Sequence, residues 1–156
     1  VKKITDQAGV PLIINDRVDI ALAVDADGVH VGQSDIPAAE ARRLLGPDKI
    51  IGVSARTVEQ ARKAEADGAD YLGVGAMFVT GTKQDAKVTS KEELKRIRAA
   101  VAIPIVAIGG IKADNVEELK GTGIDGVAVV SAVIAAENIA SAAEELAGRV
   151  KELKEA

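Results

Sequence analysis

Six short apolar runs, rich in Val and Ile, recur along this chain and alternate with segments rich in Ala, Glu, Lys and Arg. The runs cover residues 11–16, 28–32, 50–55, 71–78, 104–110 and 126–132. They are too short for helices and lack a regular polar alternation. We therefore expect strands that are buried on both faces, as in a parallel sheet. The regular alternation of such strands with helices predicts an α/β fold.

The segments between the runs carry signals for helix starts. Thr57 precedes Gln60 by three positions and Ser90 precedes Glu93 by three, which is the spacing of a capping box. Pro37 stands where proline often opens a helix, in the first turn. We expect helices over about 37–45, 58–67, 90–100, 114–120 and 138–153, and at most a short helix between the first two strands.

Composition predicts one domain over residues 1–156 and excludes several kinds of site. The length of 156 residues suits a single hydrophobic core. The chain has no cysteine, which excludes disulfides, thiolate catalysis and cysteine-based zinc sites. The net charge of −4, without a basic run, argues against nucleic-acid binding. No apolar run approaches the roughly 20 residues of a membrane helix, and the polar start does not resemble a signal peptide. We expect a cytoplasmic protein.

Asp and Gly recur just before three of the predicted strands. The repeats are "VDADGVHVG", "AEADGADYLGVG" and "KGTGIDGVAVV". We interpret each as a turn that closes a helix and leads into a strand.

Polar residues and glycines gather at the carboxyl ends of all six predicted strands. These ends carry Asn15, Asp16, Gln33, Asp35, Ser54, Thr80, Thr82, Lys83, Gly109, Gly110 and Ser131. Parallel α/β folds build their sites at this edge of the sheet. The sequence therefore predicts a site there, since the opposite strand ends carry Pro and Gly with little reactive chemistry.

The aspartates and glycines each have two interpretations. Asp16 and Asp35 are hard oxygen donors that suit Mg²⁺, which takes one or two carboxylates together with substrate phosphates. Asp35 is as well suited to capping a turn. Gly109 and Gly110 allow backbone N–H groups to approach a phosphate at a helix start, or they form a tight turn.

The loop "VTGTKQDAK" and the single histidine have two interpretations each as well. Thr80, Thr82 and Lys83 supply two hydroxyls and a positive charge for phosphate oxygens, or they belong to a solvated loop. His30 lies inside a predicted strand, before its end. A core role or a fixed tautomer therefore suits it better than catalysis.

Five stretches resemble the thiamine-phosphate synthase family, in order from about Val10 to Ala136. They are "PLIINDRVDIALAVDADGVHVGQSD", "IIGVSA", "DGADYLGVGAMFVTGTKQDA", "IPIVAIGGI" and "GVAVVSA". The resemblance implies a (βα)8 barrel of the TIM type. It also implies a transferase of thiamine biosynthesis that joins 4-amino-2-methyl-5-hydroxymethylpyrimidine diphosphate to 4-methyl-5-(2-phosphooxyethyl)thiazole. Pyrophosphate would leave first, and the thiazole nitrogen would capture the pyrimidine cation.

The resemblance also implies roles for individual residues. Asn15 would contact the pyrimidine diphosphate, Asp16 and Asp35 would hold Mg²⁺, and the catalytic candidates would be Ser54, at the pyrimidine, and Lys83, at the leaving pyrophosphate. The thiazole phosphate would be bound by Thr80, Thr82, Gly110, Val130 and Ser131.

The chain departs from the family's pattern in two ways. Arg56 follows "GVSA", where the family commonly has His; it would reach an anion or face solvent, and the missing His argues against the alternative of a thiazole tautomerase. The family also has earlier strands ending in a "Gln-x-Arg-x-Lys"-like motif, which is absent here. We therefore expect a six-stranded part of the barrel with open edges and an exposed core. Two alternatives remain open: an impaired fragment or scaffold that keeps phosphate binding, and self-association through those edges.

Overall fold

One parallel sheet forms the centre of the computed structural model, which describes residues 1–79 and 88–155, with side chains as far as Leu153. Within these residues the sheet has six strands in the order β1-β2-β3-β4-β5-β6. They are β1 (Ile13–Asn15), β2 (Gly28–Val31), β3 (Ile50–Ala55), β4 (Tyr71–Val74), β5 (Ile105–Ile108) and β6 (Gly126–Ala128). Every strand falls within one of the six apolar runs, which confirms the predicted α/β fold. The fourth strand ends at Val74, earlier than expected.

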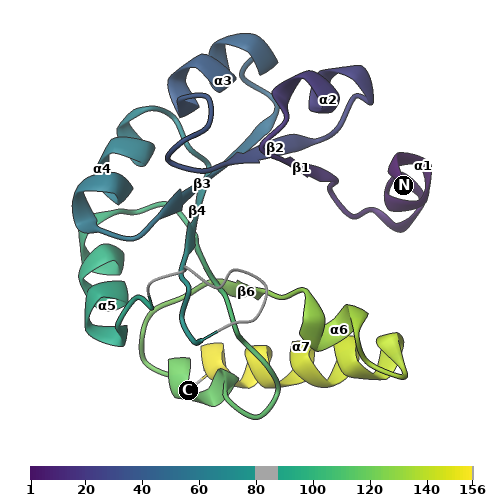
Figure 1. Ribbon diagram of the computed structural model, residues 1–156, viewed down its shortest axis with the longest axis vertical. Helices are drawn as coiled ribbons and strands as arrows, with labels where there is room; N and C mark the ends of the chain where they lie inside the picture. The colour runs from purple at the N-terminus through teal and green to yellow at the C-terminus, as the bar shows by residue number, and fades with distance from the viewer. Residues whose placement is uncertain (80–87, 156) are drawn as a thin grey trace.

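The helices that follow the strands lie outside the curled sheet, whereas the first helix precedes the first strand and lies apart from the sheet (Figure 1). The helices are α1 (Lys2–Ala8), α2 (Val18–Ala23), α3 (Ala38–Leu45), α4 (Val58–Ala66), α5 (Lys91–Ala100), the 3-10 helix η1 (Val116–Leu119), α6 (Ser131–Ile134) and α7 (Ile139–Glu155). All five expected helices are present, although the one expected over 114–120 is only the short η1. The sequence signals missed α1 and α6. None of the described helices is long and apolar enough to cross a membrane.

The predicted caps are present in part. The Thr57 hydroxyl accepts a hydrogen bond from the Gln60 N–H at 3.3 Å, and Ser90 accepts one from the Glu93 N–H at 3.1 Å. In a full capping box the Gln60 side chain would return to the N–H of Thr57. Instead it accepts from the N–H of Arg56, one residue earlier.

The outer face of the sheet is the hydrophobic core. Its buried strand residues are Val29, Val31, Ile51, Val53, Ala55, Leu72, Val74, Ile105 and Ala107. The helices cover them with small alanines, such as Ala61 and Ala64 of α4, which allow close approach, and with Leu94 and Ile97 of α5. Burying each Val, Leu or Ile side chain contributes about 1.5–3 kcal/mol, so this face supplies most of the stability.

The inner face of the sheet is much more open. The alternate strand positions His30, Ser54, Tyr71 and Val106 are only partly buried, and Ile108 is 41% exposed. The expectation that the strands are buried on both faces is therefore wrong for this face. The reason is that the helices packed on the sheet cover its outer face, and no other strand of the described residues continues the sheet beyond β1 or β6 to close over the inner face (Figure 1).

Each of the three repeats contains an aspartate that makes one recurring contact, which we call the aspartate clasp. The aspartate that directly precedes β2, β4 or β6 accepts a backbone N–H from the start of the preceding strand. The pairs are Asp27 with Leu12 (2.7 Å), Asp70 with Ile51 (2.7 Å) and Asp125 with Ile105 (2.8 Å). The expected turns are thus present, and each also ties two neighbouring strands together at their amino ends.

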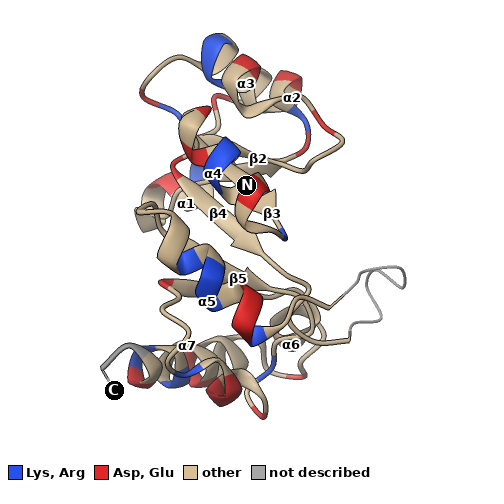
Figure 2. Cartoon of the chain, turned by 90° about the vertical axis from the view of Figure 1, so that its left-hand side faces the viewer, with Lys and Arg blue, Asp and Glu red and all other residues tan. Residues whose placement is uncertain are grey.

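Each aspartate of the clasps also faces a cation. The ion pairs are Asp27–Lys2 (3.4 Å), Asp70–Arg42 (2.6 Å) and Asp125–Arg98 (3.2 Å). The hydrogen bond from the Leu12 N–H lowers the pKa of Asp27, and Lys2 acts in the same direction. Charged residues lie on the helices and loops, while the strands carry none (Figure 2).

Candidate active site at the carboxyl ends of the strands

Four strands align a row of residues on the inner face. In register, Asn15 pairs with His30, His30 with Gly52, and Gly52 with Tyr71. Ser54 lies two residues further along β3, so it faces the same side of the sheet. The fold therefore places Asn15 and Ser54, two of the predicted site residues, on the same face of the sheet.

His30 connects Tyr71 and Ser54 through hydrogen bonds. Its Nδ1 lies 2.9 Å from the Tyr71 hydroxyl, and its Nε2 lies 2.9 Å from the Ser54 hydroxyl. The His30 and Tyr71 rings are tilted by 42°, with centroids 5.4 Å apart. Both ring nitrogens are engaged, as expected for a fixed tautomer. Tyr71 could not be identified from the sequence, because a lone Tyr at the start of a strand resembles any other strand residue.

Two glycines make room for this hydrogen-bonded chain. A Cβ added at Gly52 would lie 2.2 Å from Tyr71 Cζ and 2.4 Å from His30 Nδ1. A Cβ added at Gly73 would lie 2.9 Å from His30 Cε1. The two rings therefore occupy the space above the backbone of β3 and β4, where any larger residue would displace them.

The hydrogen-bonded side chains of Tyr71, His30 and Ser54 are uncharged at neutral pH. Burial lowers the pKa of His30 below its usual value, although the charge of Asp35 acts in the opposite direction. Burial raises the pKa of the Tyr71 hydroxyl. The inner face thus presents neutral hydrogen-bonding groups next to strand ends that carry carboxylates.

The end of β1 carries Asn15 and Asp16, both exposed. Asp16 has a left-handed backbone with φ of 64°, a conformation that Asp and Asn adopt more readily than most residues. Its N–H donates to the carbonyl of His30 at 2.8 Å. This bond fixes the end of β1 against β2, beside the row on the inner face.

Asp35 caps the turn that follows β2. Its Oδ2 accepts a hydrogen bond from the Gly32 N–H at 2.7 Å. It also lines a small cavity of about 130 Å³, together with Lys63 and Asp67 of the α4 region. The cap interpretation is therefore confirmed. The carboxylate of Asp35 keeps further lone pairs available, so a role of Asp35 in metal binding remains a prediction.

The donor set suits Mg²⁺ better than a metal held by protein alone. Over residues 1–79 and 88–155, no group of three or more His, Cys, Asp or Glu side chains lies close enough to hold an ion. Asp16 and Asp35 follow neighbouring strands and supply hard oxygen donors. Mg²⁺ with two carboxylates characteristically completes its shell with water and substrate phosphates.

A second group of predicted residues follows β5. Gly109 and Gly110 have φ of 95° and 68°, which favours glycine at both positions. A Cβ at Gly110 would lie 2.8 Å from the carbonyl oxygens of Phe78 and Val79. The tight-turn interpretation is therefore confirmed, and the phosphate cup stays a prediction. Asn115, which the sequence reasoning missed, holds this turn by donating to the Gly110 carbonyl at 2.9 Å.

Val130 and Ser131 follow β6, at the start of α6, and both are exposed. Because β5 and β6 are parallel neighbours, their following loops share one edge of the sheet. The structure thus puts Gly110, Val130 and Ser131 at the same edge as Asn15, Asp16 and Ser54. The predicted ligands Thr80, Thr82 and Lys83 lie outside the described residues.

Arg56 lies on the outer side of the site. It is exposed, and its backbone N–H is bound by Gln60. With Arg62 and Arg96 it lines an open groove of about 970 Å³ between α4 and α5. This groove is formed by the helices and includes no residue of the inner-face row, so we do not assign the site to it.

Comparison with known proteins supplies a family. Residues 1–133 match the family model described as thiamine monophosphate synthase. The chain is 66% identical to the thiamine-phosphate synthase of Clostridium beijerinckii over 146 residues. The matched region covers 94% of this chain and 70% of the relative. The chain is 57% identical over 154 residues to the thiamine-phosphate synthase of Methanobrevibacter smithii, which covers 99% of this chain and 72% of the relative.

Solved structures agree in fold. The thiamine phosphate pyrophosphorylase from Pyrococcus furiosus superposes with a TM-score of 0.89 at 47% identity, over 97% of this chain and 73% of that one. A 3-hexulose-6-phosphate synthase from Salmonella typhimurium superposes with a TM-score of 0.73 at 20% identity, over 97% of this chain and 79% of that one. The second likeness indicates a shared fold alone.

Proposed function

Because this chain belongs to the thiamine monophosphate synthase family, we propose that it couples 4-amino-2-methyl-5-hydroxymethylpyrimidine diphosphate to 4-methyl-5-(2-phosphooxyethyl)thiazole and releases pyrophosphate. The observation that carries this proposal is the identity of 66% to a thiamine-phosphate synthase over 94% of this chain. The grouping of Asn15, Asp16, Ser54, Gly110 and Ser131 at one edge of the sheet supports it.

The pyrimidine diphosphate would bind at the ends of β1, β2 and β3. Asn15 would contact its diphosphate, and Asp16 and Asp35 would hold Mg²⁺. The bound ion would supply positive charge for the departing pyrophosphate. Ser54 contacts the pyrimidine, since its hydroxyl is the polar group of β3 on the inner face. Lys83 adds a further cation for the pyrophosphate.

The thiazole phosphate would bind at the ends of β5 and β6. Backbone N–H groups near Gly110 and Val130, together with the Ser131 hydroxyl, suit phosphate oxygens, because phosphate favours backbone donors at turns and helix starts. Thr80 and Thr82 complete this set with two hydroxyls. The two substrates would therefore lie side by side along one edge of the sheet.

The reaction requires orientation and charge stabilisation more than acid–base chemistry. The carbon–oxygen bond of the pyrimidine diphosphate breaks, and its electron pair leaves with pyrophosphate. The lone pair of the thiazole nitrogen then forms the new carbon–nitrogen bond, so bond formation needs no proton transfer. The neutral side chains of Ser54, His30 and Tyr71 suit this chemistry, and preorganised charges at the leaving group supply the largest effect.

The product assay tests this function. The chain is incubated with both substrates and Mg²⁺, and thiamine phosphate and pyrophosphate are measured. We expect both products in equal amounts, and loss of both when Mg²⁺ is omitted. A folded chain that forms neither product at any protein concentration would refute the proposal.

We further propose that the chain acts in the cytoplasm, where phosphorylated substrates are retained, and that two copies associate through sheet edges. The support for association is that β1 and β6 have unpaired outer edges within the described part of the chain, and such edges favour pairing. Sedimentation at micromolar concentration would detect the dimer; a clean monomer there would exclude it. Fractionation of cells would test the location.

A further inference from the structure

His30 and Tyr71 are the only histidine and the only tyrosine of the chain, and there is no tryptophan. The two form one hydrogen-bonded chain with Ser54, with both contacts of His30 at 2.9 Å. The hydrogen bonds of this series of three side chains can be donated in either of two directions. In one, protons are donated from Tyr71 towards Ser54; in the other, they are donated from Ser54 towards Tyr71.

We propose that Tyr71 is a positioning residue that sets the direction of this chain and thereby makes Ser54 a hydrogen-bond donor to the substrate. The Tyr71 hydroxyl donates to His30 Nδ1, so the ring proton resides on Nε2. Nε2–H then donates to the Ser54 oxygen. The Ser54 proton remains available for an acceptor on the aminopyrimidine, such as a ring nitrogen. This inference rests on the proposed function only for the identity of the substrate.

The need of each hydrogen-bond donor for an acceptor favours this direction. If the ring donated from Nδ1 to Tyr71, the tyrosine proton would need another acceptor, and the hydrogen-bond partner found for this hydroxyl among the described residues is His30 itself. A partly buried donor without a partner is costly. In the proposed direction every proton of the chain has an acceptor except that of Ser54, which faces the open inner face.

The surroundings hold the chain in place. Gly52 and Gly73 leave space for the two rings and would not allow a Cβ beneath them. Gln33 donates from its side-chain amide to the Ser54 carbonyl at 2.7 Å, which fixes the backbone of Ser54. With the backbone held and the hydroxyl in contact with Nε2, the proposed His30 tautomer would determine where the Ser54 proton points.

Nuclear magnetic resonance of ¹⁵N-labelled histidine tests the direction without any substrate. The single histidine gives one pair of ring nitrogen signals, and their shifts distinguish the tautomers. At neutral pH we expect the Nε2–H tautomer in the wild-type chain and in Ser54→Ala. In Tyr71→Phe, Nδ1 loses the hydrogen bond that it accepts from the Tyr71 hydroxyl, so we expect the Nδ1 signal to move to the position of an unprotonated nitrogen without a hydrogen bond. A wild-type chain in the Nδ1–H form, or an Nδ1 signal unchanged in Tyr71→Phe, would overturn the proposal.

Calorimetry tests the consequence for binding. In Tyr71→Phe the affinity for the pyrimidine diphosphate with Mg²⁺ should fall about five- to tenfold, the effect of one lost hydrogen bond, while the affinity for the thiazole phosphate stays the same. In a Ser54→Ala background the Tyr71→Phe change should have no further effect. An equal loss for both ligands, or additive effects of the two substitutions, would show that Tyr71 is only structural.

The two measurements separate this inference from the proposed function. The tautomer is read from the free protein, so it stands or fails whatever the product assay gives. If the tautomers are as expected but the pyrimidine diphosphate does not bind, the substrate assignment fails and the direction of the chain is retained. Thermal unfolding of Tyr71→Phe, which keeps the aromatic ring, controls for loss of the fold.

Discussion

Gly52 is glycine because of its neighbours rather than its backbone angles. Its position in β3 is an ordinary strand position, but a Cβ there would overlap the Tyr71 and His30 rings. Sequence reasoning identified His30 and Ser54 as residues of interest. It could not place them in contact, because the contact depends on the register of β2 and β3 and on the absence of a side chain at Gly52.

Replacing Gly52 by Ala should destabilise the fold and disturb the site. We expect a loss of about 1–3 kcal/mol in the free energy of unfolding, typical of overpacking. Denaturant unfolding measures this loss, and the emission of Tyr71, the only tyrosine, reports the change at the rings. Gly126→Ala is the matched control, because a Cβ there meets nothing within 4 Å. Equal effects of the two substitutions would contradict the steric explanation.

Tyr71 should ionise at higher pH than an ordinary tyrosine. Its pKa is raised from 10.0 because burial disfavours the phenolate. Absorbance of the phenolate reports this one residue, as the chain has no other tyrosine and no tryptophan. A raised folded-state pKa means that the stability contributed by Tyr71 is complete below about pH 10. It is lost as the pH rises through the folded-state pKa. A midpoint at or below 10 would contradict this prediction.

At the scale of the elements, the aspartate clasps connect neighbouring strands. Their position before β2, β4 and β6 was visible in the sequence as a weak repeat, and the expected turns are present. The bond from each clasp to the preceding strand was not predicted, because it spans 15–20 residues of chain and depends on strand pairing.

Removal of the clasp at Asp70 should weaken the contact between β3 and β4. We expect Asp70→Ala to lower the free energy of unfolding by about 1–3 kcal/mol, because the Ile51 N–H loses its acceptor. Asp70→Asn keeps an acceptor oxygen and should lose less. Denaturant unfolding of the two variants distinguishes a hydrogen bond from a mere charge; equal losses would mean that the ion pair with Arg42 dominates.

Helix prediction succeeded where a cap or an apolar stripe was present. Thr57 and Ser90 mark α4 and α5 correctly, because their hydroxyls bind the first free backbone N–H groups. By contrast, α1 has no side-chain cap and no buried residue, and α6 is a single turn of four residues. Neither helix has a sequence signal strong enough to detect.

At the scale of the whole molecule, the inner face of the sheet is open, and the predicted site residues gather at the carboxyl ends of its strands. The apolar runs predicted the parallel strands correctly, because the strand residues on the outer face are buried in the core. The openness of the inner face could not be predicted from those runs. Burial of the second face depends on what lies across the sheet, and the strand sequences do not encode this.

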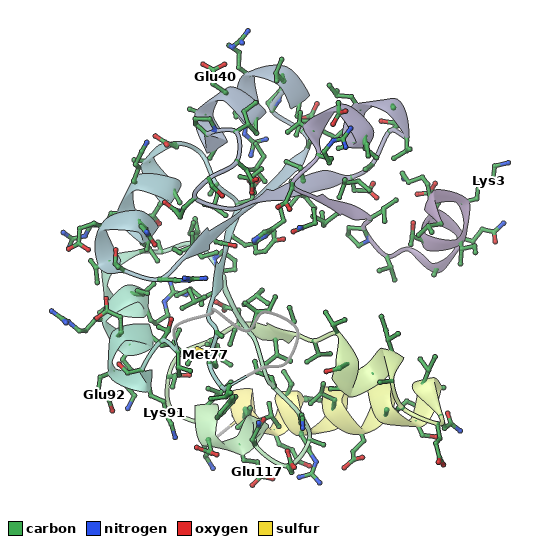
Figure 3. All side chains as sticks on the ribbon, viewed as in Figure 1. Lys3, Glu40, Met77, Lys91, Glu92 and Glu117 are labelled. Carbon is green, nitrogen blue, oxygen red and sulfur yellow. The ribbon has the colours of Figure 1, made fainter. Side chains whose placement is uncertain are left out.

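The central claim is that this edge binds the pyrimidine diphosphate together with Mg²⁺. Calorimetry of that ligand tests it most directly, with Asp35→Asn as the variant. Asn keeps an oxygen for the Gly32 N–H but removes the charge that would face the metal. Glu40→Gln is the control, because Glu40 is an exposed carboxylate that points away from the sheet on the outside of α3 (Figure 3).

The account predicts Mg²⁺-dependent binding by the wild-type chain and by Glu40→Gln, and an affinity at least about tenfold lower in Asp35→Asn, since a charge-assisted contact is lost. Absence of binding by the folded wild-type chain, or binding that depends neither on Mg²⁺ nor on Asp35, would contradict it.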